Sequence, residues 1–194
     1  MGVNFLEFVL ALTQAFTLLL PITVGGLTLI LCMRKGWLRS LDVPLDGGLT
    51  LGGMPLVGKS KSLRSLAIYT LSAILVCSVL NLIAGYSDFV SDIYQTSPVI
   101  LGPEIALAYL AGEILNSFVK RRMGIATSGN SSSWLGIRIQ SVFDNVDGII
   151  SCGALFILVY QVPASVLATS FVLSVLMHLS TDLLMRKLRL KTKQ

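Results

Sequence analysis

Two aspartates, Asp144 and Asp147, have the types and spacing best suited to chemistry. On a helix, residues at this spacing project from one face. Two neighbouring carboxylates repel each other unless a cation lies between them, and Mg²⁺, which prefers oxygen ligands and binds phosphates, suits that position. The alternative is a pair of helix N-terminal acids that complement the macrodipole. We favour metal or substrate binding over this alternative.

A polar stripe that ends in a basic cluster forms a second candidate site. Glu113, Ser117 and Lys120 recur at helical spacing, and Arg121 and Arg122 follow directly. A basic cluster at the end of an apolar segment is most often a topology anchor. That explanation accounts for the basic residues. It does not account for Glu113, because a charge inside an apolar segment is costly and usually functional.

A basic, glycine-containing loop supplies a third set of groups. It includes the stretches Pro44–Gly47 and Gly58–Arg64. Glycine lets backbone amides approach a phosphate, and Lys, Ser and Arg side chains can complete an anion cradle. The loop is not a P-loop, since the Walker spacing is absent. On local grounds, a basic loop beside anionic lipid headgroups explains the composition equally well.

Membrane helices must position these groups. The chain is 54% hydrophobic and only 13% charged, with a mean hydropathy of +0.79, which is typical of a lipid-embedded protein. A bilayer core about 30 Å thick needs roughly 20 apolar residues of helix to cross it. The sequence predicts a single, all-α, polytopic transmembrane domain over residues 1–194, with five transmembrane helices at about residues 5–33, 65–84, 99–119, 141–161 and 162–184.

The placement of charge predicts the orientation of these helices. All 15 basic residues lie in loop 34–64, in loop 120–140 or in the C-terminal tail. With five spans these segments share one side, which the positive-inside rule assigns to the cytoplasm. We therefore expect a multi-pass protein of the cell membrane with its N-terminus outside, its C-terminus cytoplasmic and its active site facing the cytoplasm. Membrane lipids, not nucleic acid, are the partners that this distribution indicates. The sequence specifies no oligomeric state.

The order of these motifs resembles the CDP-archaeol synthase family. The resemblance extends over nearly the whole chain and is carried by Pro44–Gly47, Gly58–Arg64, Gly112–Ile125 and Asp144–Asp147. Members of that family look like small relatives of the phosphatidate cytidylyltransferases. Membership implies transfer of CMP from CTP to a lipid phosphate monoester, such as an archaeol phosphate. The products would be a CDP-lipid and pyrophosphate, formed in phospholipid biosynthesis with Mg²⁺ as the cofactor.

The resemblance also implies roles for individual residues. The implied catalytic residues are Lys120, Arg121, Asp144 and Asp147. The residues implied to bind CTP and the lipid phosphate are Asp46, Gly58, Lys61, Ser62, Arg64, Ser117 and Arg122. The implied metal ligands are Glu113, Asp144 and Asp147.

Two departures from the family pattern bear on activity. Lys59 stands where the pattern has Asp, and Asn116 stands where it has Lys, so one change reverses a charge and the other removes one. These departures leave open a divergent substrate, a non-catalytic homologue or a small membrane transporter. A CDP-alcohol phosphotransferase is a further alternative, because Asp144–Gly148 reproduces that family's D-x-x-D-G pattern. The second pair of aspartates that this other family carries does not follow.

Overall fold

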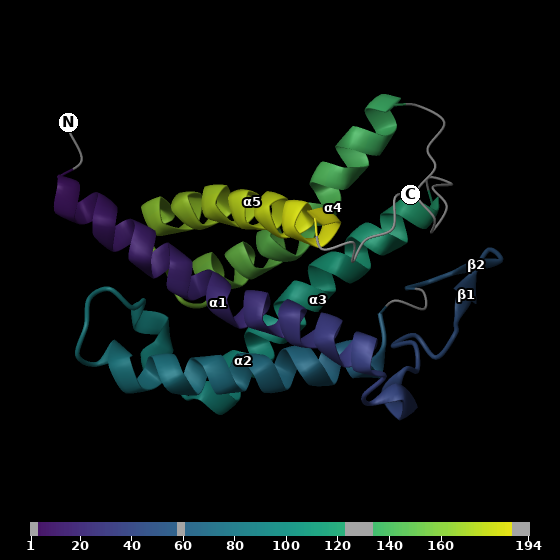
Figure 1. The fold of residues 1–194 in the computed structure, drawn as a ribbon, viewed down its shortest axis with the longest axis horizontal. Helices are drawn as coiled ribbons and strands as arrows, with labels where there is room; N and C mark the ends of the chain where they lie inside the picture. Colours follow the sequence, from purple (N-terminus) through teal and green to yellow (C-terminus); the bar gives the residue numbers. More distant parts are fainter. Residues whose placement is uncertain (1–3, 58–60, 123–133, 188–194) are drawn as a thin grey trace.

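The described residues of the computed structural model form five long helices, arranged as Figure 1 shows. The structure describes residues 4–57, 61–122 and 134–187, and within these ranges the side chains of residue 54, residues 134–145, residues 178 and 179 and residues 181–187 are not described. The helices are α1 (Phe5–Lys35), α2 (Leu63–Ala84), α3 (Pro98–Arg122), α4 (Trp134–Leu158) and α5 (Ala164–Lys187). The shorter elements are the 3-10 turns η1 (Arg39–Leu41) and η2 (Asp92–Gln95) and the strands β1 (Thr50–Leu51) and β2 (Met54–Pro55).

The helices have the apolar character of membrane spans. By length and composition, α1, α2 and α3 can each cross a membrane, with hydropathies of 2.1, 2.2 and 1.4. The helices α4 and α5 contain shorter apolar stretches in the described residues, Val146–Leu158 and Ala164–Met177. Large apolar side chains also cover the outer face of the bundle, as at Leu75 and Leu82 of α2. Such a surface suits lipid rather than water. The prediction of a helical, polytopic membrane protein is confirmed, while the orientation of the helices stays a prediction.

Close helix crossings hold the bundle together. Helix α1 packs against α2 and α5, α3 packs against α2 and α4, and α4 also packs against α5. At Gly102 of α3, an added Cβ would lie 2.7 Å from the backbone nitrogen of Ile74 in α2. At Gly148 of α4, it would lie 2.4 Å from the ring of Tyr109 in α3. Glycine lets the backbone of α2 approach α3 at Gly102 and makes room for the Tyr109 ring at Gly148; small residues at helix interfaces are the usual packing device in membranes.

The helix boundaries differ from the predicted spans at the charged ends. Helix α4 begins at Trp134, within the predicted loop 120–140, and α3 continues through its basic cluster to Arg122. The predicted spans end where charges begin. A helix makes its hydrogen bonds within its own backbone, so it continues into charged sequence beyond the apolar region. The turn between the last two helices carries Gln161 at a φ of 54°, and α5 begins directly after Pro163.

The loop between α1 and α2 is closed by backbone pairing. The amide of Leu45 donates to the carbonyl of Lys61 over 2.8 Å, and the amide of Leu63 donates to the carbonyl of Val43 over 2.9 Å. Strands β1 and β2 form a hairpin whose two-residue turn, Gly52–Gly53, has positive φ at both positions. The pairing at the base of the loop fixes Lys61 immediately before α2.

Candidate active site at the charged end of the bundle

Lys61 and Glu113 form an ion pair between the start of α2 and the last turns of α3. Only 16% of the Lys61 side chain and 19% of the Glu113 side chain are exposed. The pair explains how Glu113 is tolerated in an apolar helix, since a buried charge requires a compensating partner. It also joins the first loop to α3 over a wide separation in sequence.

Asp147 is held by donors from two helices. The side-chain amide of Asn116 in α3 donates to Asp147 Oδ2 over 2.7 Å, and the backbone amide of Gly148 donates to Oδ1 over 2.6 Å. Asn116 lies one turn beyond Glu113, so both side chains occupy one face of α3. Gly112 on that face lies against the backbone of Asp147. This close crossing is what brings Asp147 to the Glu113 face.

Lys120 adds a second positive charge to this group. Its ammonium group interacts electrostatically with Asp147, Glu113 and Lys61. We refer to Lys61, Glu113, Asn116, Lys120 and Asp147 together as the inner cluster. It contains two carboxylates and two ammonium groups. An arrangement of this kind can hold a polyphosphate and a metal ion at once, because the ammonium groups neutralise phosphate while the carboxylates supply metal ligands.

Arg121 and Arg122 contact the β1–β2 hairpin. Nη1 of Arg121 donates to the carbonyl of Pro55 over 3.3 Å, and Nη1 of Arg122 donates to the carbonyl of Leu51 over 2.7 Å. The Arg122 guanidinium also lies 4.8 Å from the centre of the Phe118 ring. These two residues therefore tether the hairpin to the end of α3. Their predicted roles in catalysis and substrate binding stay predictions.

Three residues predicted to bind substrate organise the first loop. The Asp46 carboxylate accepts hydrogen bonds from the amides of Gly48 (2.9 Å) and Val57 (2.7 Å). Ser62 is the N-cap of α2, where its side chain and that of Ser65 form a reciprocal capping box. The side chain of Arg64 is only 6% exposed and pairs with Asp42 at 3.7 Å.

Ser117 is half-buried on α3 beside Asn116. Gly58 and the side chain of Asp144 lie outside the described residues.

The donor chemistry of the inner cluster suits Mg²⁺ bound together with a phosphate substrate. Among the residues that the structure describes, no three His, Cys, Asp or Glu side chains lie close enough to form a complete metal site. Glu113 and Asp147 nevertheless bring carboxylates from two facing helices. Mg²⁺ is commonly bound by one or two carboxylates plus substrate phosphates and water, so a dedicated cage of protein ligands is not required.

Sequence reasoning missed the contribution of Asn116 and of two tyrosines. The rings of Tyr69 and Tyr109 lie 4.9 Å apart, and both side chains interact with Glu113. Tyr109 precedes Glu113 by one helical turn and Asn116 follows it by one turn, so all three share one face of α3. This spacing was the available signal for Tyr109 and Asn116, whereas Tyr69 lies on α2. The departure at Asn116 removes a charge and supplies a donor to Asp147 in its place.

Comparisons with known proteins agree with the resemblance seen in the motifs. The family model described as CarS-like, CDP-archaeol synthase, matches residues 12–194. CDP-archaeol synthases from two strains of Halobacterium salinarum are 32% identical to the chain over 82 residues, which is 42% of this chain and 45% of the relatives. The match thus spans less than half the length of these relatives.

A solved structure shares the fold. It is described as an intramembrane enzyme for archaeal membrane lipids biosynthesis, and it aligns with a TM-score of 0.63 over 93% of this chain and 95% of its own. The sequence identity is 23%, so this likeness shows the fold alone. The family model, in contrast, covers nearly the entire sequence, including every motif that forms the inner cluster. The chain therefore belongs to the CDP-archaeol synthase family.

Proposed function

We propose that this protein transfers CMP from CTP to a lipid phosphate monoester, giving a CDP-lipid and pyrophosphate. The observation that carries the proposal is the convergence of Lys61, Glu113 and Asp147 from three segments of the chain. A purely structural ion pair would not require Lys120 and Asp147 beside it. Family membership supplies the reaction class.

The reaction requires positioning and charge neutralisation rather than covalent catalysis by the protein. An oxygen of the lipid phosphate attacks the α-phosphorus of CTP. A new P–O bond forms as the bond to the bridging oxygen breaks, and pyrophosphate leaves with the bonding electrons. Lys61 and Lys120 neutralise charge on the reacting phosphates, while Asn116 orients the Asp147 carboxylate.

Glu113 and Asp147, together with Asp144, are the residues that would hold Mg²⁺. When bound, the ion neutralises phosphate charge and aligns the triphosphate. Support for this assignment is the oxygen-only donor set on α3 and α4. The Lys61–Glu113 pair contributes by holding the Glu113 carboxylate in place at this end of the bundle.

The cytoplasmic orientation is part of the same proposal. The inner cluster lies at the end of the bundle that carries Arg34 and Lys35 of α1 and the basic cluster of α3. Positive charge of this kind favours the cytoplasmic side. CTP would then be supplied from the cytoplasm, and the lipid phosphate would present its headgroup at the same interface.

An assay of pyrophosphate release tests the proposal. Purified protein is incubated with labelled CTP, Mg²⁺ and a panel of lipid phosphates that includes ether-linked isoprenoid and diacyl forms. We expect release that depends on lipid phosphate and is abolished by EDTA. Asp147→Asn should remove it while the protein stays folded. The matched control is Asp92→Asn, because Asp92 is an exposed acid in η2 whose partner is Gln95.

Other outcomes identify the alternative functions. Release of CMP from a CDP-lipid without consumption of CTP would indicate a CDP-alcohol phosphotransferase. Failure to bind or consume CTP with every lipid phosphate would indicate a non-catalytic homologue or a transporter. Near-normal turnover by Asp147→Asn would refute the assignment of the inner cluster as the active site.

A further inference from the structure

Two tyrosine rings, Tyr69 of α2 and Tyr109 of α3, pack against each other beside the inner cluster, with their ring centres 4.9 Å apart. Each ring occupies space that a glycine of another helix leaves open. A Cβ added at Gly25 of α1 would lie 2.6 Å from the Tyr69 ring. One added at Gly148 of α4 would lie 2.4 Å from the Tyr109 ring. Rings fitted so closely have little freedom, so the helix packing sets the direction of each hydroxyl group.

The two hydroxyl groups connect this ring pair to Glu113. Tyr109 makes hydrogen-bond interactions with both Tyr69 and Glu113, and it precedes Glu113 by one helical turn on the same face of α3. A carboxylate in an ion pair can only accept hydrogen bonds. The single hydroxyl proton of Tyr109 is therefore directed to Glu113, which leaves Tyr69 as the donor to Tyr109. Hydrogen bonds in such a chain strengthen one another.

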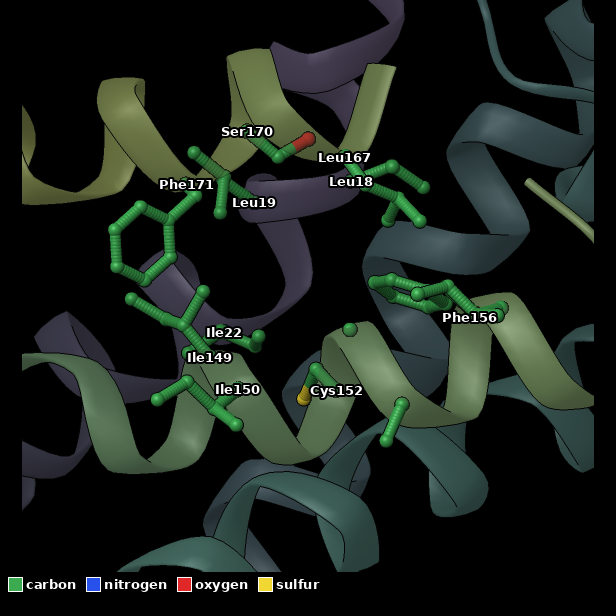
Figure 2. A pocket seen from close by; sticks show the side chains of 13 residues that line it. Leu18, Leu19, Ile22, Ile149, Ile150, Cys152, Phe156, Leu167, Ser170 and Phe171 are labelled. Atoms are coloured by element: carbon green, nitrogen blue, oxygen red, sulfur yellow. The ribbon is translucent and has the colours of Figure 1, made fainter. Parts of the chain in front are cut away.

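The apolar side of the ring pair offers Glu113 no other donor among the described residues. A pocket of about 280 Å³ borders both rings, and its remaining lining side chains are uncharged. The hydroxyls of Thr23 and Ser174 in its wall donate to backbone carbonyls of their own helices, over 2.9 and 2.7 Å. The adjoining pocket of about 360 Å³, which shares Ile22 and Ile149 with it, is also uncharged (Figure 2).

Lys61 has two tasks that draw its ammonium group in different directions. In the structure this group is paired with Glu113, whereas in the proposed reaction it neutralises a phosphate. A phosphate that attracts the ammonium group weakens the ion pair, and a carboxylate that is only 19% exposed then requires another partner. The Tyr109 hydroxyl can be that partner, because it comes from α3 itself and not from the loop that carries Lys61.

We propose that Tyr109, supported by Tyr69, positions the Glu113 carboxylate when Lys61 binds a phosphate of the substrate. This inference rests on the proposed function and adds a positioning residue outside the inner cluster. Tyr109 acts through Glu113 and does not contact the reacting atoms. Removing a hydrogen-bond partner of this outer kind typically lowers activity by about 10–100-fold.

Tyr109→Phe removes the hydroxyl and keeps the ring that fits against Gly148. At saturating Mg²⁺ and lipid phosphate, we expect kcat for pyrophosphate release from CTP to fall roughly tenfold or more, with little change in the KM for CTP. Tyr69→Phe should give a smaller loss of the same kind. The matched control is Tyr160→Phe. Tyr160 donates its hydroxyl to Glu104 near the opposite end of α3, so this variant loses an equivalent contact and should keep a normal kcat.

Thermal unfolding in detergent supplies a second readout that requires no turnover. Tyr109→Phe should lower the unfolding midpoint of the wild-type protein. It should have a much smaller effect in the Glu113→Leu background, because the Tyr109 hydroxyl has lost its acceptor there. Tyr160→Phe should lower the midpoint equally in both backgrounds, since its acceptor is Glu104.

A normal kcat in Tyr109→Phe, or a loss no greater than that of Tyr160→Phe, would overturn the inference. A higher KM for CTP at an unchanged kcat would also overturn it, because that result indicates a direct contact between Tyr109 and the nucleotide. Equal unfolding effects of Tyr109→Phe with and without Glu113 would disprove the contact between the two side chains. Absence of turnover by the wild-type protein with every lipid phosphate rejects the proposed function instead, while the unfolding comparison still tests the contact.

Discussion

Gly112 of α3 lies directly against the backbone of Asp147 in α4. A Cβ at Gly112 would be 2.3 Å from the carbonyl oxygen of Asp147 and 2.5 Å from the Ser151 hydroxyl. Neither neighbouring helix can relieve so close a contact by rotating a side chain alone, since the nearest atom is backbone. The position of Asp147 in the inner cluster therefore depends on the absence of a side chain at Gly112 in the neighbouring helix α3.

Gly112→Ala should push α3 and α4 apart. Inserting a methyl group into a packed interface has a typical effect of about 1–3 kcal/mol on stability. We expect a lower thermal unfolding midpoint in detergent and a loss of turnover, because Asn116 no longer reaches Asp147. Gly85→Ala is the control, since an added Cβ there meets nothing within 4 Å. Equal behaviour of the two variants would contradict the tight crossing.

Lys61 and Glu113 should behave as a coupled pair in unfolding experiments. Removing one partner of a buried ion pair has a typical effect of about 3–5 kcal/mol, because the other charge is left uncompensated. Lys61→Met and Glu113→Leu should therefore each destabilise the protein. The double variant should be more stable than either single variant, as judged by thermal unfolding in detergent. Additive losses would show that the two charges do not depend on each other.

Asn116→Leu tests the orientation of the Asp147 carboxylate. A hydrogen bond to a charged group contributes about 1.5–3 kcal/mol, which corresponds to a loss of turnover of roughly 10–100-fold. We expect kcat to fall more than the affinity for CTP, because the Asn116 amide positions the Asp147 carboxylate rather than contacting the cytosine base. Gln95→Leu removes a comparable amide–carboxylate contact, that with Asp92 in η2, and should have no effect on turnover. An unchanged kcat in Asn116→Leu would show that the hydrogen bond from Asn116 to Asp147 does not contribute to catalysis.

Thiol labelling tests the orientation in the membrane. Leu49 in the first loop is 63% exposed and Tyr86 after α2 is 93% exposed, whereas Cys32, Cys77 and Cys152 are buried. A membrane-impermeant maleimide should label Tyr86→Cys in intact cells and should label Leu49→Cys only after permeabilisation. The reverse pattern would place the inner cluster on the external side.

The apolar runs predicted the helices because a membrane-spanning segment must form its backbone hydrogen bonds within itself, whichever helices surround it. The pairings within the inner cluster could not be predicted in the same way. Lys61 lies in the loop before α2 and Glu113 lies in α3, and their meeting depends on the backbone pairing between Leu45 and Lys61. Likewise, Asn116 was an unexplained departure in the sequence. Its role became visible only once the crossing at Gly112 placed Asp147 beside it.

The packing of α1 against α5 has a consequence for biosynthesis. Helix α1 is made before the other four helices described, yet one of the helices that it packs against is α5, which is made after them. Until α5 is made, the face of α1 that packs against it lacks this neighbour. By that stage the chain already contains Lys61, Glu113 and Asp147, because all three precede α5 in the sequence. The packing of the bundle is therefore complete only once α5 has been made, after every residue of the inner cluster.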